Sequence, residues 1–151
     1  METDPSQVRE RILSDHRALR GLLDRVEVLA HELLEGRTSA ARELREQTRV
    51  LEERLREHMA LEERILAPAL RQADAWGSER VQHFRDDHER QRGVLEQVWR
   101  ARDDSRGGLE FALIAWGLVR LLREDMASEE RISLNERVLR DDPINPSCSP
   151  D

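Results

Sequence analysis

The sequence predicts an all-α fold, an up-down-up-down antiparallel four-helix bundle. The chain has 151 residues, 38% of them charged, with only 7 glycines and 5 prolines, a composition that favours long helices over sheet. Apolar residues recur with the helical period in four segments joined by short polar or glycine-containing stretches. Short connections place consecutive helices antiparallel. The bundle is predicted over 1–140, and 141–151, rich in proline and small polar residues, is predicted to be a flexible tail.

The first helix is predicted over about 5–35, because Pro5 suits a first turn and Gly36 stands just past its end. The second is predicted over about 38–72, after the cap-like pair Thr38 and Ser39. Pro68 has no amide proton, so it should kink this helix or end its regular hydrogen bonding one turn past Glu62. The apolar stripes of these two helices are Ile12, Leu19, Leu23, Val26 and Leu33, then Leu44, Leu51, Leu55 and Ile65.

The third helix is predicted to begin near Ser78, and the fourth to run from the turn at Gly107 and Gly108 to about residue 140. Their stripes are Val81, Phe84, Leu95 and Val98, then Ile114, Leu118, Leu121, Leu122 and Ile132. His88 falls within the third stripe, and Asp125 and Glu129 interrupt the fourth. The four helices therefore each carry polar residues on a face that should be buried.

The chain consists of two similar halves. Residues 58–65 (HMALEERI) and 125–132 (DMASEERI) share six of eight positions, and residues 15–23 (DHRALRGLL) resemble 87–95 (DHERQRGVL). In an antiparallel bundle these segments come to the same height. Six polar residues should therefore meet in one layer of the core: His16, His58, Glu62, His88, Asp125 and Glu129.

Three imidazoles and three carboxylates in an apolar layer need compensation, because each unpaired buried charge costs several kcal/mol. Metal ions supply it, and imidazole with carboxylate suits iron, manganese or zinc. The i,i+4 spacing puts His58 and Glu62 on one helix face, and likewise Asp125 and Glu129. Cys148, the one cysteine, lies in the tail and offers no ligand, and the Glu-x-x-His pattern of ferritin-type bundles is absent from the sequence. The pattern indicates a dinuclear metal site.

These motifs resemble the hemerythrin-like (HHE cation-binding) family of four-helix bundles. The resemblance covers residues 9–139 and is carried by Asp15-His16, EHMALEERILAPAL (57–70), Asp87-His88 and EDMASEERISL (124–134). It implies two non-haem irons, with His16 and His58 as terminal ligands of one metal and His88 of the other. Glu62 and Glu129 would bridge the pair, together with an oxo, hydroxo or water bridge. Manganese or zinc could replace iron.

Asp125 stands where the family pattern has its fourth His. It could bind the second metal directly, act through water or as an outer partner, or mark the loss of that metal. Direct ligation would add a third carboxylate, which favours the oxidised state and lowers the reduction potential. This difference favours redox chemistry or sensing over reversible O2 carriage.

We therefore expect a protein that binds or reacts with O2, peroxide or NO. The sequence leaves open whether the protein is an enzyme. Two alternatives are a non-catalytic metal-binding or sensing bundle that acts through a partner protein, and a structural helical module with a vestigial site.

The net charge of −7 and the interleaved Arg and acidic residues argue against nucleic-acid or membrane partners. No apolar run is long enough to span a bilayer, and the N-terminus lacks a signal-peptide pattern, so we expect a cytoplasmic location. The sequence leaves the oligomeric state open.

Overall fold

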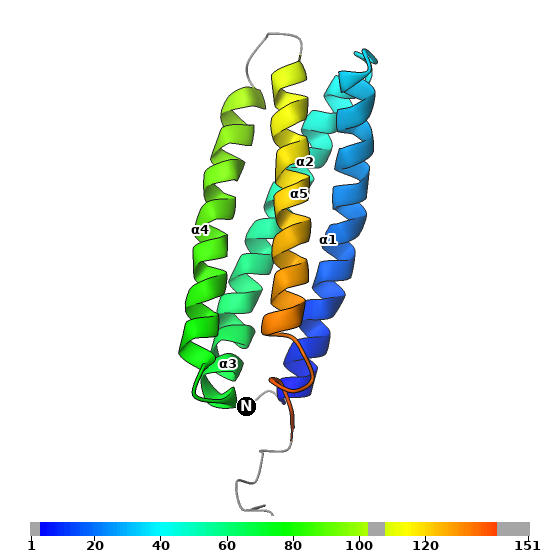
Figure 1. Ribbon diagram of the computed structural model, residues 1–151. Helices are drawn as coiled ribbons and strands as arrows, with labels where there is room; N and C mark the ends of the chain where they lie inside the picture. The colour runs from blue at the N-terminus through cyan, green and yellow to red at the C-terminus, as the bar shows by residue number, and fades with distance from the viewer. Residues whose placement is uncertain (1–3, 103–107, 142–151) are drawn as a thin grey trace, which may run out of the picture.

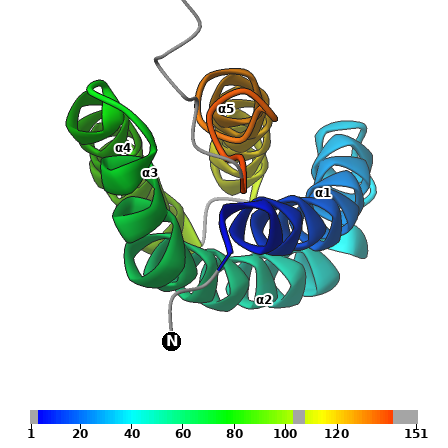
Figure 2. The same cartoon turned by 90° about the horizontal axis from the view of Figure 1, so that it is seen from below.

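The computed structural model describes residues 4–102 and 108–141, and these residues form a bundle of four long helical rods. The rods are α1 (Pro5–Leu34), a second rod formed by α2 (Ala40–Leu61), a π-helical turn (Glu62–Leu66) and α3 (Ala67–Ala73), then α4 (Gly77–Arg102) and α5 (Leu109–Ile132). Each long helix lies beside its chain neighbour, and α5 returns to pack against α1 (Figures 1 and 2). The all-helical prediction is confirmed for the described residues.

Local sequence sets the helix ends close to the predicted positions. Asp4 caps α1 by accepting a hydrogen bond from the Ser6 amide, and Pro5 takes the first helical position. Gly36 has a φ of 91°, a left-handed conformation that favours glycine after a helix. At the tight turn between α3 and α4, a Cβ added to Gly77 would lie 2.0 Å from the Leu70 carbonyl oxygen, so only glycine fits.

The second rod changes its hydrogen bonding in the turn before Pro68. The Ala67 amide donates to the carbonyl of Glu62, five residues earlier, which makes Glu62–Leu66 a π-helical turn. The predicted interruption at this proline is confirmed, although it begins at Glu62 itself. Ile65, predicted to face inward, packs against the smaller part of the core but is only half-buried, because the wider turn shifts the helix face and buries Leu66 instead.

The fourth helix ends at Ile132 and not near residue 140 as predicted. The Asn135 side chain donates to the carbonyls of Arg131 and Ile132, and the backbone carbonyl of Asn135 accepts the amide of Leu139, so the chain turns back under the bundle. Ile132 is consequently exposed, against the prediction, while Leu139 is buried. Ile114 and Leu121 of the predicted stripe are only half-buried. The predicted tail, apart from Asp141, as well as Cys148 and Gly107 lie outside the described residues.

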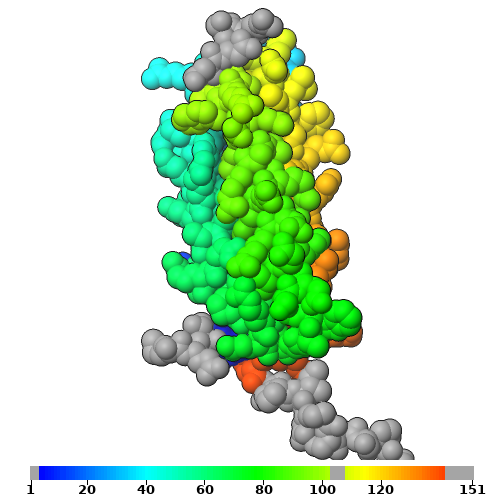
Figure 3. Space-filling view, turned by 90° about the vertical axis from the view of Figure 1, so that its left-hand side faces the viewer, coloured from blue at the N-terminus to red at the C-terminus, as the bar shows by residue number. Residues whose placement is uncertain are grey.

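The core consists of two hydrophobic clusters, one in each part of the bundle. The larger includes Leu23 of α1, Leu55 of α2 and Leu122 of α5. The smaller closes the end near the N-terminus with Ile12, Leu66 and residues of the final turn. Figure 3 shows α4 covering one side of the bundle between the second rod and α5. Among the described helices, none is both long and apolar enough to cross a membrane.

Candidate metal centre

A layer of buried polar residues separates the two hydrophobic clusters. On α1, His16 lies between Ile12 of the smaller cluster and Leu19 of the larger, and on α4 His88 lies between Phe84 and Leu95 in the same way. The exposed fractions of these residues run from 0% to 9%, although all six can carry charge. They are the six predicted site residues: His16, His58, Glu62, His88, Asp125 and Glu129.

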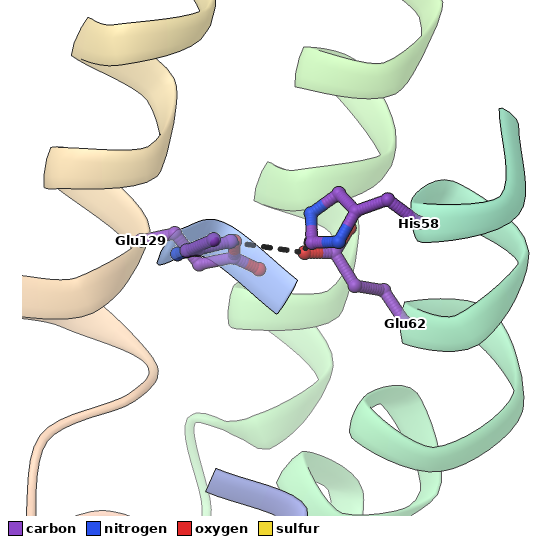
Figure 4. A group of neighbouring side chains, drawn as sticks. His58, Glu62 and Glu129 are labelled. Atoms are coloured by element: carbon purple, nitrogen blue, oxygen red, sulfur yellow. Dashed lines mark ion pairs between the residues drawn. The ribbon is translucent and has the colours of Figure 1, made fainter. Parts of the chain in front are cut away.

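Four of these residues form a compact cluster, in which one ligand atom from each lies within 4.8 Å of all the others. His58 Nε2 is 2.8 Å from Glu62 Oε1, and His16 Nε2 is 3.2 Å from Glu129 Oε2 and 3.8 Å from Glu62 Oε1. Figure 4 shows His58 and Glu62 extending from successive turns of the second rod, with Glu129 reaching toward them from α5. Helices distant in sequence thus deliver two imidazoles and two carboxylates to one point.

The outer nitrogens of the two clustered histidines have carboxylate partners. His58 Nδ1 is 2.7 Å from Asp15, and His16 Nδ1 is 2.9 Å from Glu130, which Arg20 also contacts at 2.7 Å. A metal-binding histidine almost always donates its second ring N–H to such a partner, which fixes the tautomer and the ring orientation. Both Nε2 atoms are therefore directed into the cluster.

Comparison with protein-family models identifies the family of this chain. The hemerythrin HHE cation binding domain model matches residues 7–135. The chain belongs to this family. Searches of curated proteins and of solved structures gave no significant match. The family and the four-residue cluster together make this a metal-binding helical protein.

The second half of this HHE domain is arranged differently from the first. His88 Nε2 lies 2.5 Å from Glu62 Oε2, but His88 Nδ1 has no hydrogen-bond partner among the described residues. Asp125 faces the same small cavity as His88, yet its two carboxylate oxygens accept hydrogen bonds from Arg90 at 2.8 Å and Gln91 at 2.9 Å. Neither His88 nor Asp125 is part of the four-residue cluster.

The electrostatics of the cluster follow from its burial. Burial alone would lower the pKa of His16 and His58, but the adjacent carboxylates outweigh it and raise these pKa values to about 9 and about 10. Burial would raise the pKa of Glu62, but His58 and the other imidazoles hold it well below its usual range. Burial and the charge of Glu62 raise the pKa of Glu129 to about 8. Without a cation, the cluster at neutral pH holds protons on both imidazoles and on Glu129.

The residues of this HHE domain fit a metal ion. His16 Nε2, Glu62 Oε1 and Glu129 Oε1 are buried, and none forms a hydrogen bond with a described residue. Buried polar atoms that form no hydrogen bond are rare, and here three of them meet in one cluster, two of them with ion-pair contacts alone. Mixed nitrogen and oxygen donors suit iron, manganese or zinc. A cation in the cluster would satisfy these lone pairs and replace the protons.

A small cavity of about 20 Å³ adjoins the centre. Its polar lining includes Glu62, His88 and Glu129, and its apolar lining includes Leu23, Phe84 and Leu122. A space of this size holds about one water-sized molecule. The cavity therefore has room for a molecule of about the size of water beside the centre.

The structure brings all six predicted residues into one layer, but it gives Asp125 partners that the sequence reasoning missed, Arg90 and Gln91. It also reveals Glu130 as the partner of His16. His83 is exposed, as its position on the helix predicts. Aligning the two halves could have pointed to Arg90 and Gln91, because the first half has Ala18 and Leu19 at these positions.

Proposed function

We propose that this protein is a non-haem iron protein of the hemerythrin type that binds or reacts with a small oxidant, namely O2, peroxide or NO. The observation that carries the proposal is the convergence of four imidazole and carboxylate ligand atoms within 4.8 Å, beside a cavity of about 20 Å³. The ligand types suit iron, and the cavity has room for a small molecule beside them.

In the up-down-up-down order that we propose for the bundle, His16 and His58 would hold the first iron. Glu62 has one oxygen beside His58 and the other beside His88, and this supports the proposal that a second iron would share Glu62, as it would share Glu129. His88 and Asp125 would complete the second position. When bound, iron would be redox-active and would keep coordination positions that the protein ligands do not fill.

The other residues of the centre orient the ligands and exclude bulk water. Asp15 and Glu130 accept the Nδ1 protons of His58 and His16, so each Nε2 can bind a cation once it has lost its own proton. The side chains of Leu23, Phe84 and Leu122 form part of the apolar lining of the cavity. A neutral diatomic molecule enters such a space without the desolvation cost that an ion would meet.

Metal analysis of the protein purified without chelators tests the proposal. We expect at least one iron per chain, lost in His58→Ala and kept in the control His83→Ala, which alters an exposed histidine of α4. Less than one iron per chain in the unmodified protein would refute the proposal.

A second measurement separates reaction from sensing. Removal of more than one equivalent of peroxide or NO per chain, followed spectroscopically, would indicate turnover. A single stoichiometric spectral change would indicate binding, as in the sensing bundle. Iron that responds to none of O2, peroxide and NO would contradict both forms of the proposal.

A further inference from the structure

The two halves of the chain allow their contacts to be compared position by position. The Asp-His segments align Asp15 with Asp87, and the repeated octets align His58 with Asp125. In the first half, Asp15 accepts the Nδ1 proton of His58 at 2.7 Å. The equivalent pair in the second half is Asp87 and Asp125, two carboxylates of like charge that cannot form this bond.

Two further differences between the halves compensate for the like charges of Asp87 and Asp125. Arg90 stands where the first half has Ala18, and Gln91 stands where it has Leu19. The Arg90 guanidinium donates to Asp87 and to Asp125, each at 2.8 Å, so one nitrogen bridges the two carboxylates. Three of the positions at which the halves differ, 90, 91 and 125, are therefore in direct contact.

These contacts use both oxygens of Asp125. Arg90 binds Oδ1, and the Gln91 amide donates to Oδ2 at 2.9 Å. A metal ion bound by Asp125 would have to displace one of these donors, and displacing Arg90 would break a pair whose carboxylate is buried. The guanidinium supplies a positive charge where a second metal ion would otherwise supply it.

The histidines of the two halves also differ in their outer contacts. Each clustered histidine of the first metal position has a carboxylate on Nδ1, whereas His88 Nδ1 has no hydrogen-bond partner in the part of the chain that the structure describes. The residue equivalent to Glu130 is Glu63, and Glu63 is paired with Arg85 at 2.8 Å. Loss of such outer partners typically weakens metal binding about 10- to 100-fold.

We propose that Arg90 and Gln91 compete with a metal ion for Asp125, so that the centre binds one ion tightly and a second at least about 100-fold more weakly. The tight ion is held by His16, His58, Glu62 and Glu129, and the weak one competes with the Arg90 guanidinium for Asp125. This inference rests on the proposed function in taking the layer as a metal centre, but it does not depend on the identity of the oxidant.

Calorimetric titration of the full-length, chelator-treated protein with Mn²⁺ tests the inference, with native mass spectrometry to count the bound ions. Mn²⁺ is used because it stays divalent in air. The unmodified protein should show one tight step and a second that is weaker by about two orders of magnitude. Arg90→Met should tighten the second step about 10-fold or more, because Asp125 is released. The control Arg92→Met, an exposed arginine on the same helix, should leave both steps unchanged.

A triple variant sharpens the test. R90A/Q91L/D125H gives the second half the residues that the first half has at the three positions, and should bind two ions with affinities within about 10-fold of each other. Two steps of similar affinity in the unmodified protein, or an unchanged second step in Arg90→Met, would overturn the inference while leaving the proposed function intact. Should the triple variant not fold, the Arg90→Met comparison decides. No bound ion in the unmodified protein would overturn the proposed function itself.

Discussion

Metal binding should release protons in a number that the structure sets. Ligands must be deprotonated to bind a metal. At pH 7 the raised pKa values of His16, His58 and Glu129, about 9, about 10 and about 8, keep all three groups protonated. Loading one ion should therefore release about three protons. Below pH 8 the affinity should rise with pH, by about 1000-fold per pH unit.

The proton count can be measured by calorimetry with Mn²⁺ in buffers of different ionisation enthalpy, repeated between pH 6 and pH 8. Glu129→Gln removes one titrating ligand and should reduce the count to about two. Glu124→Gln, an exposed glutamate on the same helix, should leave it at about three. A release of less than one proton, with an affinity that is flat over this pH range, would refute the reasoning, because the imidazoles would then be neutral before the metal binds.

In the metal-free protein, the raised pKa values of the two histidines contribute stability that is fully present below their ordinary value of 6.5 and is lost as the pH rises through 9 to 10. An unfolding free energy from urea titration that is no lower at pH 10 than at pH 6.5 would contradict this. Glu62→Gln should lower the unfolding free energy of the metal-free protein by about 3 kcal/mol, since it removes the buried counter-charge of the imidazoles, whereas the exposed Glu57→Gln should change it by less than about 0.5 kcal/mol. Asp15→Asn should weaken metal binding about 10- to 100-fold by leaving His58 without its carboxylate partner, and an effect equal to that of the surface variant Asp24→Asn would argue against this.

The helical bundle and the burial of the six polar residues in one layer could be predicted because both depend on regular spacing. His58 and Glu62 are four residues apart, and the repeat of their octet at 125–132 marks the matching turn of another helix. The helix ends were less predictable. The end of α5 at Ile132 depends on the Asn135 side chain bonding back to the last turn, and the π-helical turn at Glu62 shifts the inward face from Ile65 to Leu66. Neither effect follows from the hydrophobic period.

The sequence by itself determined that six ionisable residues share one buried layer, because helical period and an internal repeat place side chains by residue count alone. Only the tertiary structure decided which of them meet. His16 and Glu129 come together from α1 and α5, and Asp125 is taken up by Arg90 and Gln91 of α4. Such pairings depend on how neighbouring helices are rotated and set in height against each other, and packing between the helices fixes that relation.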